Sequence, residues 1–413
     1  MSKVIYHRDT CRGCGSKILE LIFSLNPSPI GDAYVPIDKI QLEQPSYPID
    51  LYMCNECGLA QLSDVIDPDI LYGDYIYTTT SSVLLSDHFL EYSKMVIEKC
   101  KIIKGSLVID IGSNDGTLLK HFKQQGMKVI GVEPAVQIAA QATAAGIHSI
   151  DEFFTLNLAK KIVTKYGNAN LITANNVFAN IDDLISWIRS IDELLAIDGV
   201  FVFESYYLLD LLNNMVFDFI YHEHLSSFSV KPIEALFKRL GFELFSVERI
   251  STKGGSLRYF IQRFNGPLIA DKSVTEMLRL EEEKCLYKKE TYTIYSSKIN
   301  KIKHATKDFL VNAKKEGKSI AGFGASVTGT TLIYHFEIGE YLDYLVDDNP
   351  AKQGLFSPGL HIPVYPTSEI YNRRPDYVIL LAWRFADSII KKNRSYINDG
   401  GHFLVPIPEL KIC

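Results

Sequence analysis

The stretch SLVIDIGSNDGTLLKHF, residues 106–122, decides how this chain folds. Its residues 107–111 are a short apolar run of the kind that forms a buried parallel strand. Residues 112–116 enclose Ser-Asn-Asp between two glycines, which predicts a tight turn, and a helix is expected after it. A second apolar run at 128–132 ends at Glu133. A strand, a glycine turn, a helix and a second strand ending in an acid predict a doubly wound α/β sheet.

The glycine turn favours S-adenosylmethionine over a dinucleotide as the ligand of this sheet. Gly112 lets the backbone approach a cofactor, and Glu133 is suited to bind a ribose diol. A dinucleotide needs a G-x-G-x-x-G turn for its pyrophosphate, but Asn114 and Asp115 replace the second glycine. Carboxylates repel pyrophosphate, whereas Asp110 and Asp115 attract the sulfonium and ammonium groups of S-adenosylmethionine. The alternative is a vestigial site in which Asp110 only caps the turn.

Polar residues also follow the next predicted strands of the sheet. The run at 170–174 precedes Asn175 and Asn176, and the strand within DGVFVFESYYL ends at Glu204. Together with Pro134, these residues are expected to line the cofactor crevice, which lies beyond the carboxyl ends of the strands. Each of them singly also fits the ordinary polarity of a strand end.

Four of the seven cysteines form two C-x-x-C pairs, each followed by a glycine. The pairs are Cys11 with Cys14 and Cys54 with Cys57. Two intervening residues let one turn present both sulfurs, and Zn²⁺ prefers four thiolates in a tetrahedron. Because four thiolates complete the coordination shell, we expect a structural rather than catalytic ion. Buried apolar cysteines or a single redox pair are the alternatives.

A histidine cluster, Tyr221-His222-Glu223-His224, is the third chemical signal. Its spacing differs from that of the zinc motif H-E-x-x-H, and it predicts a loop or edge strand that enters a pocket. In an extended strand, His222 and His224 would face opposite sides. One histidine is then a candidate general base, while Glu223 or Tyr221 orients a substrate or stabilises an oxyanion. A hydrogen-bonded histidine loop without catalysis is an equal alternative.

The last third of the chain predicts a second nucleotide-binding fold. Residues 271–316 are charged and helical, and SIAGFGASVTG then restarts the strand, turn and helix pattern. The amides from Gly324 to Ser326 are placed to hold a phosphate at a helix start, although tight packing also needs small residues there. Lys352, on the Pro/Gly-rich loop after the next strand, is expected to face the same phosphate.

The composition restricts the function classes. The 413 residues are 47% hydrophobic and 22% charged, which fits a globular chain of two or three domains. The net charge of −6 lacks the basic excess of a nucleic-acid binder. No apolar run reaches membrane-spanning length, and the N-terminus has no apolar signal segment. We therefore expect a cytoplasmic protein without nucleic-acid or membrane partners. We also expect it to be a monomer.

Taken together, these motifs resemble the sugar C-methyltransferases that act on nucleotide-linked 4-keto-6-deoxyhexoses. The resemblance covers nearly the whole chain and rests on both C-x-x-C-G pairs, DIGSNDGTLL, ANNVFA, YHEH, GGSLR and DDNPAKQG. It implies a zinc-binding module at 1–70 and a doubly wound S-adenosylmethionine-dependent methyltransferase domain at 71–265. It also implies a C-terminal Rossmann-like domain at 266–413 that contributes to nucleotide-sugar binding.

The resemblance further implies which residues act on the sugar. His224 would remove the proton from C3, which the neighbouring 4-keto group acidifies, in the biosynthesis of a branched deoxysugar. Tyr221, Glu223 and a tyrosine of the pair Tyr75 and Tyr77 would lie nearby, with a tyrosine donating to the enolate oxygen. The enolate carbon would then attack the sulfonium methyl.

At several positions the chain departs from the pattern of this family. The family often has histidine where this chain has Asn180 and Lys253, and tyrosine and lysine where it has Phe323 and Thr328. These departures leave open whether the sugar carries guanosine or thymidine diphosphate, and which sugar it is. The candidate substrate-binding residues are Asn180, Lys253, Gly324, Ser326 and Lys352.

Two other functions compete. An NAD-dependent nucleotide-sugar oxidoreductase or epimerase would use the GFGAS turn and the acids Asp347 and Asp348, but Thr330 stands where packing favours glycine. A non-catalytic zinc-ribbon scaffold would have no need of the YHEH cluster.

Overall fold

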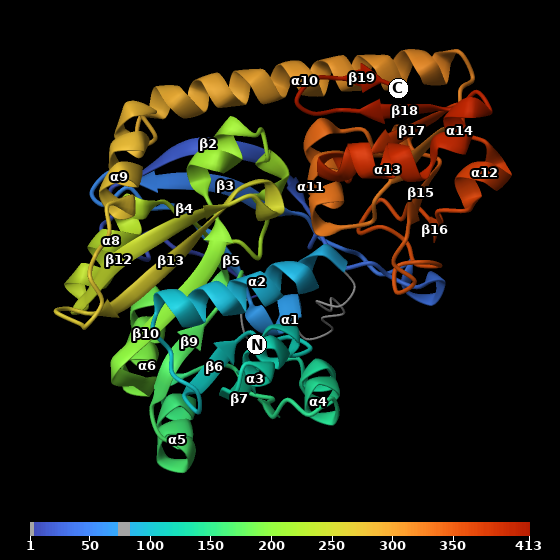
Figure 1. Cartoon of the computed structure of the whole chain (residues 1–413). Helices are drawn as coiled ribbons and strands as arrows, with labels where there is room; N and C mark the ends of the chain where they lie inside the picture. Colours follow the sequence, from blue (N-terminus) through green and yellow to red (C-terminus); the bar gives the residue numbers. More distant parts are fainter. Residues whose placement is uncertain (1–3, 73–82) are drawn as a thin grey trace.

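The computed structural model describes residues 4–72 and 83–413. Three larger sheets and one two-stranded ladder form its frame, with helices around them (Figure 1). Within the described ranges, none of the helices has both the length and the apolar character needed to span a bilayer.

The central sheet has seven strands. From one edge to the other they are β12 (Phe242–Ile250), β13 (Ser256–Arg263), β10 (Leu195–Tyr206), β9 (Ala169–Thr173), β6 (Leu107–Ile111), β7 (Lys128–Val132) and β8 (Ser149–Ile150). The strands from β6 to β10 are parallel, and β13 lies between β10 and β12, antiparallel to both. Because the chain builds outward from β6 in both directions, a crevice forms beyond the carboxyl ends of β6 and β9. The predicted doubly wound sheet is confirmed.

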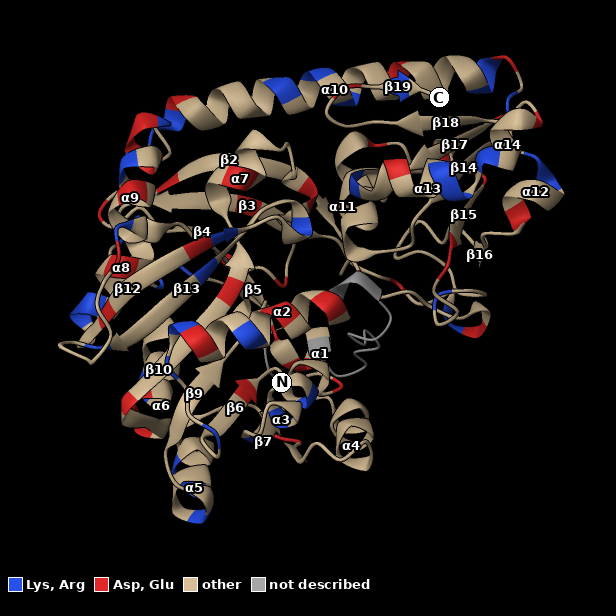
Figure 2. Ribbon diagram, in the orientation of Figure 1, with Lys and Arg blue, Asp and Glu red and all other residues tan. Residues whose placement is uncertain are grey.

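Helices cover both faces of this sheet. They are α2 (Val83–Lys99), α3 (Thr117–Gln124), α4 (Val136–Ala144), α5 (Leu156–Tyr166), α6 (Leu184–Leu194) and α8 (Val230–Arg239), whereas α7 (Leu208–Asn213) lies beside the N-terminal strands β2 and β3 (Figure 2). On β6, Val108 belongs to the buried cluster that contains Leu119 of α3, whereas Ile109 belongs to the cluster that contains Leu158 of α5. Burial on both faces explains why these strands are continuous apolar runs rather than alternating ones.

The N-terminal segment forms an antiparallel sheet that takes one strand from the middle of the chain. Its strands are β2 (Leu19–Ser28), β3 (Tyr47–Cys54), β4 (Ala60–Leu62) and β11 (Ser226–Ser227), and β1 (Ile5–His7) pairs separately with β5 (Asp64–Ile66), before the short helix α1 (Pro68–Tyr72). Strand β11 follows the histidine cluster directly and pairs with β4. The predicted boundary at residue 70 stays a prediction, but the N-terminal sheet includes residues from beyond it.

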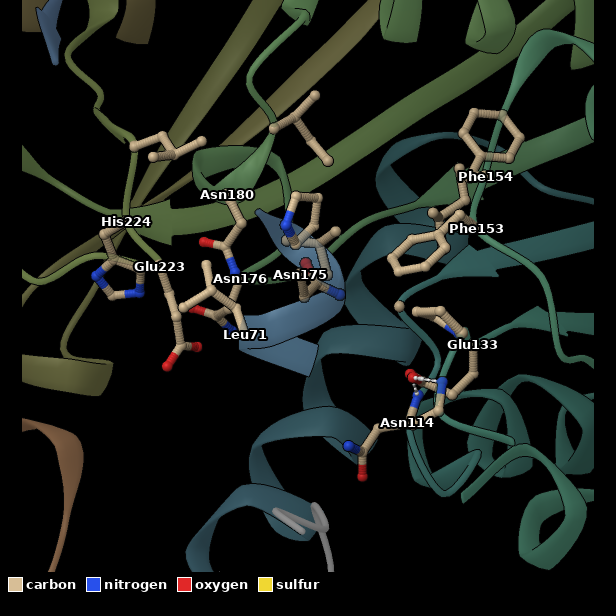
Figure 3. Close-up of a pocket in the computed structure, with 18 of the residues that line it drawn as sticks. Leu71, Asn114, Glu133, Phe153, Phe154, Asn175, Asn176, Asn180, Glu223 and His224 are labelled. Atoms are coloured by element: carbon tan, nitrogen blue, oxygen red, sulfur yellow. Dashed lines mark hydrogen bonds between the residues drawn. The ribbon is translucent and has the colours of Figure 1, made fainter. Parts of the chain in front are cut away.

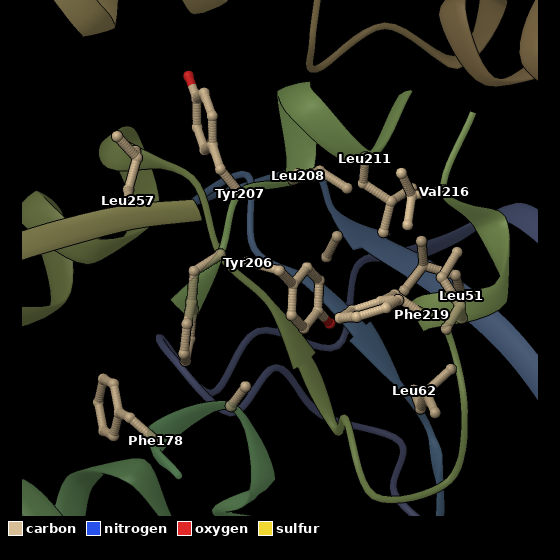
Figure 4. Packing of buried hydrophobic residues seen from close by; sticks show 14 of the residues in the cluster. Leu51, Leu62, Phe178, Tyr206, Tyr207, Leu208, Leu211, Val216, Phe219 and Leu257 are labelled. Carbon is tan, nitrogen blue, oxygen red and sulfur yellow. The ribbon is translucent and has the colours of Figure 1, made fainter. Parts of the chain in front are cut away.

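Apolar packing holds this sheet against the region of the histidine cluster. Leu51 of β3 and Leu62 of β4 lie beside Val216 and Phe219, and all four are buried (Figure 4). Each fully buried side chain of this size contributes about 1.5–3 kcal/mol relative to exposure. The N-terminal sheet is therefore part of the wall behind the cluster.

The C-terminal part contains the second parallel sheet, as predicted. Its strands, from one edge to the other, are β16 (Val364–Pro366), β15 (Tyr344–Asp347), β14 (Ile320–Phe323), β17 (Tyr377–Leu380), β18 (His402–Val405) and β19 (Lys411–Ile412), of which only β19 is antiparallel to its neighbour. The helices are α11 (Val327–Phe336), α12 (Glu369–Arg373), α13 (Ala386–Lys392) and α14 (Arg394–Asn398).

A long charged connection joins the two doubly wound parts. It consists of α9 (Ser273–Glu283) and the 27-residue α10 (Lys289–Lys315), which confirms the predicted helical region. In Figure 1, α10 runs along the N-terminal sheet and on to the C-terminal part, and the blue and red segments of its ribbon in Figure 2 mark the positions of its charged residues. The short 3-10 helices are η1 (Ile37–Lys39), η3 (Phe178–Asn180), η4 (Phe217–Phe219), η5 (Thr252–Gly254), η6 (Gly339–Tyr341) and η7 (Trp383–Phe385).

Candidate active site

A cavity of about 460 Å³ opens at the crevice of the central sheet. This volume is in the range of small-molecule sites. It joins two groups of residues that the sequence analysis predicted separately, and Figure 3 shows Glu133 and Asn114 at one end and Glu223 and His224 at the other. The predicted site residues that line it are Asp110, Gly112, Asn114, Glu133, Pro134, Asn175, Asn176, Asn180, Tyr221, Glu223, His224 and Lys253. Tyr75 and Tyr77 lie outside the described residues.

Glu133 is held rigidly at the cofactor end of the cavity. Its two carboxylate oxygens accept hydrogen bonds from the backbone amides of Asn114 and Ala135, both at 2.9 Å (Figure 3). Burial raises the pKa of Glu133, and the two amides oppose that rise. A carboxylate oxygen has room for further donors, so this geometry fits a ribose diol. Gly112 has φ +70°, and a Cβ atom there would collide with Val177, so only glycine fits at this position.

The two aspartates of the turn have different surroundings. Asp110 lines the cavity and accepts a hydrogen bond from Thr173 Oγ1 at 2.6 Å. Burial raises the pKa of Asp110 to about 7, so a cation placed beside it would favour its charged form. Asp115 is not among the lining residues, and its Oδ1 accepts from the amide of Thr117 at 3.1 Å and from Thr117 Oγ1 at 2.6 Å. Asp115 thus forms a local Asx turn just before α3.

Two phenylalanines complete the cofactor end, and the sequence analysis did not single them out. Phe153 and Phe154 follow β8 and line the cavity near Glu133 (Figure 3). Phe154 contacts Trp187 edge to face at 5.5 Å, while 47% of Phe153 is exposed. The exposed ring of Phe153 offers a flat apolar surface beside Glu133. The signal in the sequence that would have found these residues is the pair of consecutive phenylalanines shortly after β8.

The histidine cluster is a tight turn rather than an extended strand. The amide of His224 donates to the carbonyl of Tyr221 at 2.8 Å. Nδ1 of His224 lies 2.7 Å from the carbonyl oxygen of Phe219, and Nε2 lies 2.9 Å from the hydroxyl of Tyr221. Because a carbonyl oxygen only accepts, Nδ1 carries the proton and Nε2 keeps its lone pair. Burial lowers the pKa of His224 to about 3, so the ring is neutral at physiological pH.

His222 does not line the cavity, whereas His224 does. The two histidine rings were expected on opposite sides of an extended strand, but a turn separates them. Nε2 of His222 lies 3.3 Å from the carbonyl oxygen of Tyr47, and its ring meets that of Tyr47 edge on at 5.9 Å. Burial lowers the pKa of His222 to about 4. This histidine therefore packs the N-terminal sheet against the turn.

Glu223 and Lys253 face the same cavity with pKa values shifted toward each other. Burial, with the charge of Asp32, raises the pKa of Glu223 to about 8. Lys253 is exposed to the cavity. The cavity walls limit the hydration of its ammonium group, and this desolvation lowers the pKa of Lys253 to about 8. It has φ +55°, a backbone conformation that is costly for a residue with a Cβ atom and that clusters at functional sites. Nearby, the buried Oδ1 of Asn180 has no hydrogen-bond partner among the described residues, which fits a ligand contact.

The predicted phosphate-binding residues of the C-terminal part are not brought to this cavity. Ser326 Oγ accepts from the amide of Gly329 at 3.2 Å and caps α11. In the same turn, which begins at Gly324, the amide of Ala325 donates to Asp347 at 2.6 Å. Lys352 is buried, pairs with Asp32 at 2.6 Å, and lies 4.4 Å over the ring of Tyr34. These groups have protein partners of their own, so the phosphate contact stays a prediction.

The C-terminal part instead contacts the segment just before the histidine turn, through a residue that the sequence analysis did not single out. The guanidinium of Arg384 lies 4.1 Å over the ring of Phe219 and 3.8 Å from Asp218. The indole of Trp383 donates to Asp218 at 3.0 Å. The carbonyl of Phe219 accepts the hydrogen bond from Nδ1 of His224. The contacts of Arg384 and Trp383 with Phe219 and Asp218 therefore stabilise the residue that orients His224.

The four cysteines of the two C-x-x-C pairs come together, as predicted. All four sulfurs lie within 4.8 Å of one another, and the closest pairs are 3.5 Å apart. Zn–S bonds of about 2.3 Å in a tetrahedron require sulfur separations of about 3.8 Å, so the cluster fits one zinc ion. Gly15 and Gly58 take φ +79° and +80°, as the turns require.

Family comparisons follow the same division of the chain. Residues 11–72 match "Putative zinc binding domain", 89–247 match "Methyltransferase domain", and 251–408 match "C-methyltransferase C-terminal domain". Together with the crevice, the glycine turn and the buried acid Glu133, these matches define an S-adenosylmethionine-dependent methyltransferase that carries a zinc module.

The most informative relative covers the whole chain. The sequence is 31% identical to C-methyltransferase NovU of Streptomyces niveus over 417 positions, which span 100% of this chain and 98% of that protein. The chain therefore belongs to the C-methyltransferase family, with S-adenosylmethionine as methyl donor and Zn²⁺ in its N-terminal module.

Two further comparisons cover only part of the chain. An uncharacterized methyltransferase of Alkaliphilus oremlandii (strain OhILAs) is 28% identical over 214 residues, which span 45% of this chain and 97% of that protein. The magnesium protoporphyrin IX methyltransferase of Synechocystis PCC 6803, solved with bound SAH, matches 47% of this chain and 91% of its own at 15% identity and a TM-score of 0.36.

Proposed function

We propose that this C-methyltransferase removes the C3 proton of a nucleotide-linked 4-keto-6-deoxy sugar and methylates that carbon. The observation that carries the proposal is the neutral His224, which shares one cavity with Glu133, the acid that we assign to the cofactor. Methylation of carbon needs a carbanion equivalent, and a ketone next to the reacting carbon provides one as an enolate. A site for this reaction needs a base, donors to the enolate oxygen and an aligned methyl donor.

His224 is the base in this proposal. The bond from Nδ1 to the carbonyl of Phe219 fixes the tautomer and leaves the lone pair on Nε2, 2.9 Å from the hydroxyl of Tyr221. After proton abstraction, the same carbonyl stabilises the imidazolium. The low pKa of His224 is caused by burial, and an adjacent enolate raises the basicity of the ring because it forms an ion pair with the imidazolium.

Lys253, Tyr221 and protonated Glu223 supply donors for the enolate oxygen. All three line the cavity beside His224. With a pKa of about 8, Lys253 is mostly charged at neutral pH, and Glu223, also near 8, is mostly protonated. A cation in a cavity with little water interacts with an oxyanion far more strongly than in bulk solvent. Lys253 stands where related enzymes often have histidine, so we assign it the electrophilic role here.

The remaining cavity residues place the two substrates. When bound against Gly112 and Glu133, S-adenosylmethionine supplies the electrophilic methyl group. Asn175 and Asn176 lie between the two ends of the cavity, and Asn180 approaches the sugar end (Figure 3). Holding both reactants in one cavity is worth several powers of ten in rate for reactions of this type. The domain limits 1–70, 71–265 and 266–413 belong to the same proposal.

A panel of 4-keto nucleotide sugars, with guanosine and thymidine diphosphate as carriers, tests the function. We expect one of them to gain a single methyl group on carbon, detected by mass and located at C3 by NMR. A methyl group on oxygen, or no transfer to any member while the enzyme still binds S-adenosylhomocysteine, would rule out the proposed substrate class.

A further inference from the structure

Arg12 lies between Cys11 and Cys14, in the turn that we call the zinc knuckle, yet its side chain points into the protein. It is fully buried, with 0% of the side chain exposed. Its backbone amide donates to Gln61 Oε1 at 2.8 Å, and its guanidinium donates to the carbonyl of Leu62 in β4. An arginine is rarely buried so completely unless its hydrogen bonds are used.

The same guanidinium reaches both walls of the active-site cavity. Nε donates to Asp182 at 2.9 Å, and Nη1 donates to the carbonyl of Leu225 at 3.3 Å. Asp182 lies two residues after Asn180, and Leu225 directly follows His224. Asp182 and Leu225 both line the cavity themselves. One side chain therefore contacts the loop after β9 and the histidine turn, which are more than 40 residues apart in the sequence.

We infer that Arg12 is a positioning residue of the methyltransferase, through which the zinc knuckle sets the distance between the Asn180 loop and the His224 turn. The inference rests on the proposed function only in that this turn acts on the substrate. The knuckle suits the task because two ligated cysteines flank Arg12 and hold its backbone. A displacement of about 1 Å between reacting groups costs about 10²-fold in rate, so small movements of these walls matter.

The choice of arginine follows from the geometry. Through Nε and Nη1 its planar fork serves the carboxylate and both carbonyls at the same time, while Nη2 has no hydrogen-bond partner among the described residues; the single ammonium of lysine does not have that reach. Arg8 is a natural control, because it also pairs with Asp182, at 3.2 Å, but it is 24% exposed and, among the described residues, has no side-chain hydrogen bond to Leu225.

The test compares Arg12→Met and Arg12→Lys with Arg8→Met. Zinc content, affinity for S-adenosylhomocysteine, kcat and KM are measured together with hydrogen–deuterium exchange of peptides covering 178–183 and 221–227. For Arg12→Met we expect about one zinc per chain and cofactor affinity within about threefold of wild type. We expect faster exchange in both segments and a kcat about 10²-fold lower. Arg12→Lys should recover part of the loss, and Arg8→Met should lose less than about threefold.

Three results would overturn the inference. The first is an equal effect of the Arg8 and Arg12 substitutions. The second is faster exchange throughout the central sheet, including 107–111, which would make Arg12 a general stabilising residue. The third is loss of zinc from both Arg12 variants. If Arg12→Met does not fold, Arg12→Lys alone decides by the same criteria. The exchange measurement needs no substrate, so it distinguishes a wrong role for Arg12 from a wrong role for His224.

Discussion

Replacing Lys253 with methionine tests whether a cation stabilises the enolate in this enzyme. Methionine has a similar length and flexibility but no charge, and the cavity position of Lys253 leaves the cofactor end untouched. Loss of one donor to a developing oxyanion costs about 10²–10³-fold in kcat. We therefore expect this loss in Lys253→Met, with the affinity for S-adenosylhomocysteine within about threefold of wild type.

The pH dependence gives the same prediction an independent readout. Lys253 is charged below its pKa of about 8 and neutral above it, so the wild-type rate should fall as pH rises through 8. Glu223 has a pKa near the same value and also loses its proton there. Glu223→Gln keeps a donor but has no titrating proton, and it should therefore retain the alkaline fall if Lys253 causes it. Lys253→Met should show a smaller fall than wild type, because only Glu223 still titrates near pH 8 in that variant.

The assay is the initial rate of methyl transfer to the accepted 4-keto nucleotide sugar from pH 6 to 10, with the cofactor saturating. Lys253→His is the matched variant, because it restores a weaker donor with a pKa near 6.5. Its activity should lie between wild type and the methionine variant. A loss of less than about threefold in Lys253→Met, or an unchanged alkaline fall in that variant, would refute the electrophilic role.

Four further outcomes are expected. His224→Asn should lose about 10²–10⁴-fold in methyl transfer and should no longer exchange the C3 proton with deuterated solvent; methylation at the wild-type rate would assign the base elsewhere. Glu133→Ala should weaken binding of S-adenosylhomocysteine by about 1–3 kcal/mol in calorimetry, and unchanged affinity would remove Glu133 from the site. Protein purified without chelator should contain about one zinc per chain, and less than half an equivalent would contradict the zinc assignment. Burial lowers the pKa of His222 from 6.5 to about 4, so the folded state favours the neutral ring. The contribution of this histidine to the free energy of unfolding is therefore lost as the pH falls from 6.5 to 4. His222→Asn should flatten the fall in unfolding free energy over that range by up to about 3 kcal/mol, and an unchanged slope in denaturant titrations would exclude this histidine as its cause.

Local patterns were sufficient for several elements and for the cysteine cluster. The apolar run at 107–111 forms β6 with the predicted ends, and α3 starts at Thr117 after the glycine turn. The strand predicted to end at Glu204 continues two residues further, to Tyr206. The two cysteine pairs meet as one cluster. These features depend on neighbouring residues and on the coordination preferences of zinc, both of which can be read along the chain.

Contacts between distant segments needed the tertiary structure. Lys352 looked like a phosphate ligand in the sequence, but it pairs with Asp32, more than 300 residues away. Arg12 and Arg384 carried no recognised motif, yet both support the His224 turn from segments that the sequence separates widely. The reason is physical: a charged side chain is neutralised or directed by whatever partner the packing of the whole chain brings within about 4 Å. The shifted pKa values of Glu223 and Lys253 have the same origin, because desolvation by the cavity walls and neighbouring charges exist only once the three sheets have packed together.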